Sequence, residues 1–204
     1  MKILMLGNSL TAANHMPVML AQKLDAEVTV HARGGARLAE QLNPDTKMGA
    51  RTAQVLRERN FDYVILQEMS HGPATATERY LDSVRKLAKL VREAGAEPVL
   101  YATWAFRPGC EKLESIGMDA EEMHRQMQEA FRMAVENDAL AASANSASAT
   151  EGNQLLLANV GEAFRERGFA DELYAPDGLH PSEEGSRLAA EVIAEVISNR
   201  EHEV

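Results

Sequence analysis

The sequence predicts a three-layer α/β/α fold built on a five-stranded parallel sheet. Short, almost uninterrupted apolar runs alternate along the chain with longer amphipathic segments, as expected where helices cover strands on both faces. This alternation favours parallel strands that are joined by helical crossovers. The 204 residues suffice for one domain with its own core, and no shift in composition marks a boundary, so residues 1–204 are expected to form a single domain.

Five apolar runs of strand length are expected to form the sheet. In chain order they are Ile3–Leu6, Val28–His31, Tyr63–Leu66, Pro98–Ala102 and Leu155–Val160. Because each run is nearly continuously apolar instead of alternating strictly with polar residues, each strand is predicted to be covered on both faces.

Helical spacing and start signals mark the segments between these runs. Pro17 suits the first turn of a helix that reaches Leu24, and a second helix is predicted from Met48 to Arg59. Thr75 and Glu78 have the spacing of a capping box, ahead of a helix that ends at Gly95.

Two further helices are predicted nearer the C-terminus. Asp119 and Glu122 form a second capping-box pattern, and the last helix begins at about Ser182. The Ala- and Ser-rich stretch Ala139–Thr150 is either the end of a helix or a loop.

Composition excludes several classes of function. There are 21 basic and 31 acidic residues, a net charge of −10, and the basic residues do not cluster, so no nucleic acid partner is expected. The single cysteine, Cys110, excludes an internal disulfide and a CxxC zinc site, and the histidines show no metal-ligand spacing. Neither a metal nor a cofactor is therefore expected.

The chain also lacks the marks of membrane insertion or secretion. No apolar run approaches the roughly 18 residues that a membrane helix needs. Met1-Lys2 precedes only a strand-length apolar run, and no cleavage-site pattern follows it. We therefore expect a cytoplasmic protein with no membrane partner.

Candidate chemistry follows the predicted strands. Sites in open parallel sheets form beyond the carboxyl ends of the strands. Ser9 follows the first strand, Gly35 the second and Gln67 the third, while Asp177 and His180 stand just before the last helix. The topology brings these loops to one edge of the sheet.

These residues are the components of an acyl-transfer site. Ser9 can act as nucleophile, His180 as its general base and Asp177 as the group that orients the imidazole. The backbone N–H groups of Ser9 and Gly35 and the side-chain amide of Gln67 can supply an oxyanion hole.

Each signal also has a structural explanation. Ser9 could be a helix N-cap, Gly35 part of a turn, and the Asp177–His180 spacing a loop hydrogen bond. Gln67 could tie down a neighbouring loop. The convergence of these signals at one edge favours the catalytic interpretation.

The ordered blocks resemble those of the SGNH/GDSL hydrolase superfamily. The resemblance rests on Gly7-Asn8-Ser9-Leu10, on Gly35, on a side-chain amide after the third strand, and on Asp177-Gly178-Leu179-His180-Pro181. Members are esterases, lipases, thioesterases and carbohydrate O-deacetylases on a three-layer α/β/α, flavodoxin-like fold. The resemblance implies Ser9, Asp177 and His180 as the triad, and a Ser9 and Gly35 oxyanion hole.

Two positions depart from the family pattern. Asn8 stands where the family usually has Asp, and Gln67-Glu68 replace the usual Gly-x-Asn-Asp block. Gln67 offers the same kind of amide one methylene further out, so we expect it to serve as an oxyanion donor.

The function expected from these residues is cleavage of small carboxylic esters by a serine esterase or O-acetylesterase, with carbohydrate O-acetyl groups as one substrate class. Trp104 and Phe106, which follow the fourth strand, could line the substrate pocket or pack in the core. A non-catalytic small-molecule or carbohydrate binding module on the same fold is the alternative. A flavin or nucleotide binder is disfavoured, because the chain has no glycine-rich phosphate loop. Oligomeric state is not predicted.

Overall fold

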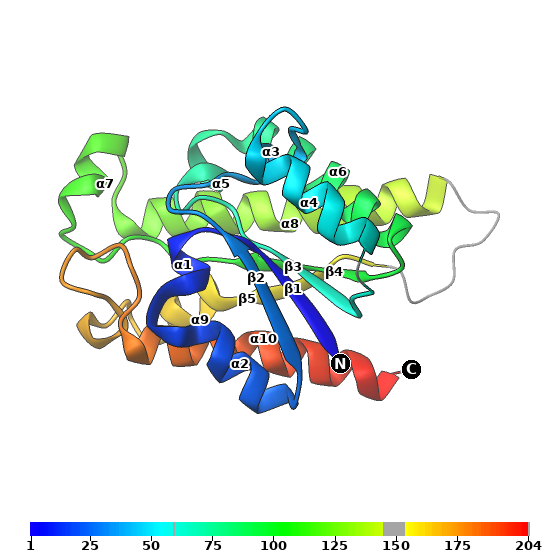
Figure 1. Ribbon diagram of the computed structural model, residues 1–204. Coiled ribbons are helices and arrows are strands. Elements are labelled where there is room, and N and C mark those ends of the chain that lie inside the picture. Colours follow the sequence, from blue (N-terminus) through cyan, green and yellow to red (C-terminus); the bar gives the residue numbers. More distant parts are fainter. Residues whose placement is uncertain (59, 145–153, 204) are drawn as a thin grey trace.

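A five-stranded parallel sheet forms the centre of the protein. The computed structural model describes residues 1–58, 60–144 and 154–203, and its strands lie in the order β2-β1-β3-β4-β5 (Figure 1). Every adjacent pair is parallel. The strands are β1 (Lys2–Gly7), β2 (Glu27–Ala32), β3 (Tyr63–Leu66), β4 (Glu97–Ala102) and β5 (Leu156–Asn159).

Helices cover both faces of the sheet and complete the three layers. Figure 1 shows one layer made of α1 (Ser9–Ala12), α2 (Met16–Leu24), α9 (Val160–Glu166) and α10 (Glu183–Glu203). The opposite layer contains α3 (Leu38–Leu42), α4 (Lys47–Glu58), α5 (Gly72–Thr75), α6 (Thr77–Glu93) and α8 (Ala120–Ala144). The short helix α7 (Glu111–Ile116) projects beyond the sheet, and the 3₁₀ turns η1 (Ala13–His15) and η2 (Asp171–Leu173) complete the described elements.

The predicted fold class is confirmed, and each predicted strand lies within one residue of an observed one. The continuous apolar runs explain β1 and β3, whose residues Ile3–Leu6 and Tyr63–Leu66 are buried. The two edge strands depart from the prediction of two covered faces. Val30 of β2 is 40% exposed, and three of the four residues of β5 are only partly buried.

Three of the four helix start signals were correct, and the first of them, Pro17, lies in the first turn of α2. Asp119 Oδ1 accepts from the backbone N–H of Glu122 at 2.8 Å ahead of α8, and Ser182 Oγ accepts from the N–H of Gly185 at 3.1 Å ahead of α10. The Thr75 prediction was wrong, because α6 begins after Ala76 without a side-chain cap. Thr75 instead ends α5 and bonds the carbonyl of His71 at 3.0 Å.

The Ala- and Ser-rich stretch Ala139–Thr150, expected to be a helix end or a loop, begins as helix. Helix α8 continues to Ala144, and positions 145–150 lie outside the described residues.

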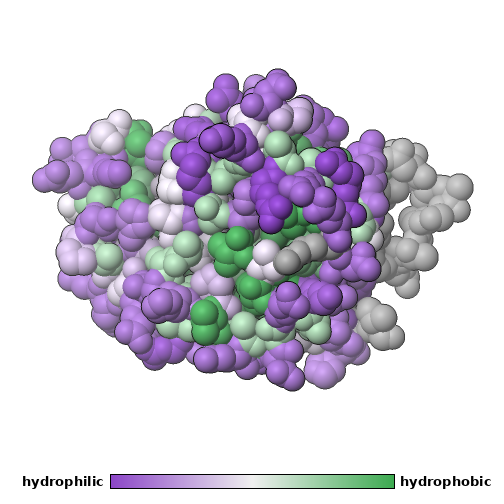
Figure 2. Space-filling view, in the orientation of Figure 1, coloured by the Kyte–Doolittle hydropathy of each residue, from purple (hydrophilic) through white to green (hydrophobic). Residues whose placement is uncertain are grey.

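Figure 2 shows a largely hydrophilic face with hydrophobic side chains gathered near its middle, over the region of edge strand β2. Over the described residues, no helix has the length and apolar character to span a membrane. The cytoplasmic location stays a prediction.

Candidate active site

Ser9 lies at the sharp turn between β1 and α1. Asn8, and not Ser9, caps α1, since Asn8 Oδ1 accepts from the backbone N–H of Leu10 at 3.0 Å. The turn needs glycine at position 7, because a Cβ there would lie 2.4 Å from Thr11 Oγ1 and 2.6 Å from Gln67 Oε1. The Ser9 side chain is therefore not used as a cap and stays half-buried at the end of the sheet.

Ser9, His180 and Asp177 form one hydrogen-bonded chain. Ser9 Oγ lies 2.9 Å from His180 Nε2, and His180 Nδ1 lies 2.6 Å from Asp177 Oδ2. The other oxygen, Asp177 Oδ1, accepts from the backbone N–H groups of Leu179 and His180, both at 3.0 Å. Asp177 thus fixes both the loop that carries the histidine and the orientation of the ring.

The hydrogen bonds around Asp177 keep its carboxyl group ionised. Partial burial works against the charged form, but the hydrogen bonds from the His180 side chain and from the Leu179 and His180 backbone outweigh it and lower the pKa of Asp177 to about 2. An ionised carboxylate beside Nδ1 holds the proton on that nitrogen, which leaves Nε2 able to accept a proton from Ser9.

The His180 loop is braced by the segment that follows β4. Trp104 Nε1 donates to the carbonyl of Leu179 at 3.2 Å, and the Arg107 N–H donates to the carbonyl of Gly178 at 2.9 Å. Cys110 Sγ lies 3.4 Å from the carbonyl of Asp177. This single cysteine, for which the sequence offered no role, therefore helps to hold the acidic residue in place.

A second brace comes from the nucleophile side. Asn14 Nδ2 donates to the carbonyl of Pro181 and to Ser186 Oγ, both at 2.9 Å. Asn14 adopts a left-handed conformation, with φ of 50°, in the turn η1 between α1 and α2. Sequence reasoning missed this link, because nothing in the local pattern shows that η1 meets a loop more than 160 residues away.

Gly35 occupies a tight turn directly after β2. The N–H of Ala36 donates to the carbonyl of Arg33 at 2.9 Å, and Gly35 has φ of 67°, which glycine adopts without strain. Asn8 Nδ2 donates to the carbonyl of Ala36 at 3.0 Å. The turn that carries Gly35 is thereby tied to the turn that carries Ser9.

Gln67, which directly follows β3, supports the Ser9 turn through hydrogen bonds. Its Oε1 accepts from the Asn8 N–H and from Thr11 Oγ1, both at 2.9 Å, and its Nε2 donates to the carbonyl of Glu68. The side chain is fully buried. These contacts favour the structural alternative for Gln67, a side chain that ties down a neighbouring loop, over the expected oxyanion donor.

Trp104 and Phe106 are buried, which favours core packing over the other expected role, that of lining the substrate pocket. Their side chains are 2% and 1% exposed. Trp104 stacks on Phe164 with a ring separation of 4.3 Å, and Phe106 packs edge-on against His71 at 6.1 Å. Trp104 reaches the His180 loop through its hydrogen bond to the carbonyl of Leu179.

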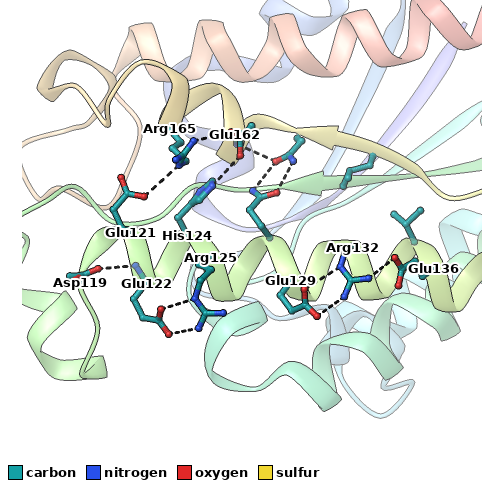
Figure 3. Close-up of a pocket in the computed structure, with 14 residues that line it drawn as sticks. Asp119, Glu121, Glu122, His124, Arg125, Glu129, Arg132, Glu136, Glu162 and Arg165 are labelled. Carbon is teal, nitrogen blue, oxygen red and sulfur yellow. Dashed lines mark hydrogen bonds and ion pairs between the residues drawn. The ribbon is translucent and has the colours of Figure 1, made fainter.

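A separate groove of about 1000 Å³ lies between α8, β5 and α9 (Figure 3). No member of the Ser9–His180–Asp177 chain lines it. Its three arginines are engaged in ion pairs within the wall, as in Glu122–Arg125 and Glu129–Arg132, and acidic residues outnumber them. We therefore do not assign the chemistry to this groove.

Fold and site together define a class. The protein is an α/β/α protein with a hydrogen-bonded Ser–His–Asp chain beyond the carboxyl ends of its parallel strands. No family model and no curated protein matches the sequence.

Solved structures identify the family. A protein from Slackia heliotrinireducens described as an SGNH hydrolase is 53% identical, with a TM-score of 0.86, over 97% of this chain and 98% of that one. This chain belongs to the SGNH hydrolase family. Two distant structures share the fold: TesA at 18% identity (98% and 99% of the chains, TM-score 0.66) and the acetyl xylan esterase AlAXEase at 12% (97% and 100%, TM-score 0.66).

Proposed function

We propose that the protein is a serine hydrolase that cleaves small carboxylic esters through an acyl-enzyme. The observation that supports this most directly is the continuous hydrogen-bonded path from Ser9 Oγ through His180 to Asp177, with distances of 2.9 and 2.6 Å. A nucleophile, a base within hydrogen-bond reach and a third group that orients the base are the components that acyl transfer requires.

The proposed first half-reaction forms the acyl-enzyme. Ser9 Oγ attacks the ester carbonyl carbon while its proton moves to His180 Nε2, and Asp177 stabilises the imidazolium that results. The tetrahedral intermediate then collapses, the C–O bond to the alcohol breaks, and His180 returns the proton to the leaving alkoxide. A water molecule repeats the sequence with the acyl-enzyme and releases the carboxylic acid and Ser9.

The negative charge on the tetrahedral oxygen needs hydrogen-bond donors. We assign this role to the backbone N–H groups of Ser9 and Gly35. N–H groups in the first turn of a helix have no partner inside the helix, so the Ser9 N–H is suited to the task. The bond from Asn8 to Ala36 supports Gly35 in this role, because it ties the two turns together.

We propose short acyl groups as substrates, with O-acetyl groups on carbohydrates as one class. The only described extension between β4 and α8 is the short segment that contains α7, so the described residues offer no long lid for an acyl chain. One distant structure with the same fold is an acetyl xylan esterase. We therefore expect acetyl to butyryl esters to be cleaved more efficiently than esters of about ten carbons.

A panel of p-nitrophenyl esters and acetylated sugars tests the proposal. The wild-type protein should hydrolyse acetyl and butyryl esters, and Ser9→Ala should not. Ser115→Ala is a matched control, because Ser115 is an exposed serine on α7 that bonds only a carbonyl of its own helix. No hydrolysis of any ester by the wild type, together with saturable binding of the acetylated sugars, would favour a binding module instead.

A further inference from the structure

Glu68 is a buried carboxylate that the proposed triad does not use. It directly follows Gln67 at the end of β3, and its exposed fraction is 7%. Burial raises its pKa, although the backbone N–H groups of Met69 and Leu38 work in the opposite direction. A buried acidic group is costly unless it is hydrogen-bonded, so its contacts indicate what it stabilises.

Its two oxygens join two separate loops. Glu68 Oε1 accepts from the N–H of Met69 at 2.7 Å, within its own loop after β3. Glu68 Oε2 accepts from the N–H of Leu38 at 3.2 Å, the first residue of α3. Leu38 comes three residues after Gly35, so the carboxylate anchors the far end of the turn that carries Gly35.

The residues that directly follow Gly35 are therefore held by two side chains from different parts of the site. Asn8 Nδ2 fixes the carbonyl of Ala36 from the nucleophile side, and Glu68 fixes the N–H of Leu38 from the β3 side. Tight packing holds Glu68 itself, because a Cβ on Gly72 would lie 3.0 Å from Glu68 Cγ. The Glu68 carboxylate consequently has a defined position from which to act on the turn.

We propose that Glu68 is a positioning residue that sets the Gly35 N–H in the oxyanion hole. This inference rests on the proposed esterase function. Glu68 does not touch the substrate, and it acts by accepting the Leu38 N–H. A glutamine at this position has one oxygen in place of two, so it can accept from Met69 or from Leu38 through that oxygen but presents an NH₂ group to the other donor.

The test compares wild type with Glu68→Gln and with Asp138→Asn. Asp138 is a matched control, because its carboxylate is also 7% exposed and also accepts from a backbone N–H, that of Leu155 at 3.0 Å. Asp138 pairs with Arg92 and has no contact with the Gly35 turn. Its substitution reports the effect of losing a buried acidic group without loosening that turn.

Three readouts separate positioning from a general loss of stability. Misplacement of a reacting group by about 1 Å can cost about 100-fold in rate. We expect Glu68→Gln to lower kcat by about 10- to 100-fold and to leave KM within about twofold. The inhibition constant for methylboronic acid, whose tetrahedral Ser9 adduct places an oxygen in the oxyanion hole, should rise by the same factor.

The inhibition constant is the decisive value, since it does not depend on the fraction of protein that is active. Asp138→Asn should leave it unchanged. If Glu68→Gln retains kcat within threefold of the wild type, or loses kcat with an unchanged inhibition constant, Glu68 does not position the oxyanion hole. If Glu68→Gln fails to fold, Glu68→Asp, which keeps the charge but is shorter by one methylene, should show the same paired changes.

Hydrogen–deuterium exchange keeps this inference distinguishable from the proposed function. Amides of residues 33–42 should exchange faster in Glu68→Gln than in the wild type and be unchanged in Asp138→Asn. If Glu68→Gln exchanges faster but the wild type hydrolyses no ester, the esterase proposal is contradicted while the link between Glu68 and the Gly35 turn is supported. Unchanged exchange in Glu68→Gln would contradict that link itself.

Discussion

Gln67 Oε1 accepts a hydrogen bond of 2.9 Å from the backbone N–H of Asn8, the residue directly before Ser9. The same oxygen accepts from Thr11 Oγ1, so one buried side chain holds both ends of the Ser9 turn. The amide that sequence reasoning assigned to the oxyanion is thus directed at the backbone that presents the nucleophile.

Gln67→Ala is expected to lower stability as well as activity. The Asn8 N–H and the Thr11 hydroxyl, both buried, lose their acceptor, and each buried group left unsatisfied costs about 1–3 kcal/mol. Urea unfolding and kcat measured on the same preparation check this. Thr11→Val, which removes only one of the two donors, should cost less. A 100- to 1,000-fold fall in kcat with unchanged stability, the typical effect of deleting an oxyanion donor, would show that Gln67 acts on the oxyanion instead.

Asn8→Asp, which restores the usual family residue, is expected to be harmful in this chain. The carboxylate can still cap α1 through the Leu10 N–H, but it cannot donate to the carbonyl of Ala36 as Asn8 Nδ2 does. We expect kcat to fall by about tenfold, because the Gly35 turn loses one anchor. Steady-state kinetics test this, and a kcat equal to that of the wild type would show that the Asn8–Ala36 bond has no role in catalysis.

The activity is expected to rise from about pH 5 to 8, the range in which a histidine general base typically becomes neutral and able to accept the proton of the nucleophile. Asp177, with a pKa of about 2, stays ionised throughout this range. A kcat/KM profile that is flat from pH 5 to 8, with chemistry rate-limiting, would exclude His180 as the base.

Asp177→Asn separates the charge of Asp177 from its role in the loop. The amide oxygen can still accept from the Leu179 and His180 N–H groups, so the loop is preserved, but the charge that favours the imidazolium is lost. We expect kcat to fall on the order of 100- to 10,000-fold.

Asp177 is also expected to stabilise the fold in a pH-dependent way. The folded-state pKa of its carboxyl group lies below the ordinary value of 3.8, so the stabilisation that Asp177 gives is complete at neutral pH in the wild type. It is lost as the pH falls from about 4 towards 2, and in Asp177→Asn an acid unfolding curve should lack this component.

Trp104→Phe is expected to weaken the support of the His180 loop without changing substrate binding. Phenylalanine can keep the stacking on Phe164, but it loses the hydrogen bond to the carbonyl of Leu179. We expect a loss of about 0.5–1.5 kcal/mol in stability and a few-fold lower kcat. A large increase in KM with little change in kcat would instead indicate that Trp104 lines the substrate pocket.

The sequence predicted the framework well because its strong signals are local. Continuous apolar runs such as Tyr63–Leu66 are sufficient to predict buried strands, and the loops after parallel strands must meet at one edge. The proximity of Ser9, Asp177 and His180 could therefore be predicted from the sequence alone. In the structure they lie within hydrogen-bond reach of one another along the chain Ser9–His180–Asp177.

The direction of a side chain at the end of a strand was much harder to predict. Gln67, Trp104 and Phe106 all follow strands at the correct edge, yet all three side chains are buried. Composition does not distinguish a pocket wall from an interior, because aromatic and amide groups serve in both. The exposed edge position of β2 likewise depends on the order of strands in the sheet, which periodicity does not reveal.

The central claim, that Ser9 is the nucleophile, is tested most directly by labelling with a fluorophosphonate. Intact-mass and peptide mass spectrometry should find one adduct on the wild type, located on Ser9, and none on Ser9→Ala, while Ser115→Ala is labelled like the wild type. An adduct on another residue, or ester turnover by Ser9→Ala at a substantial fraction of the wild-type rate, would contradict the mechanism.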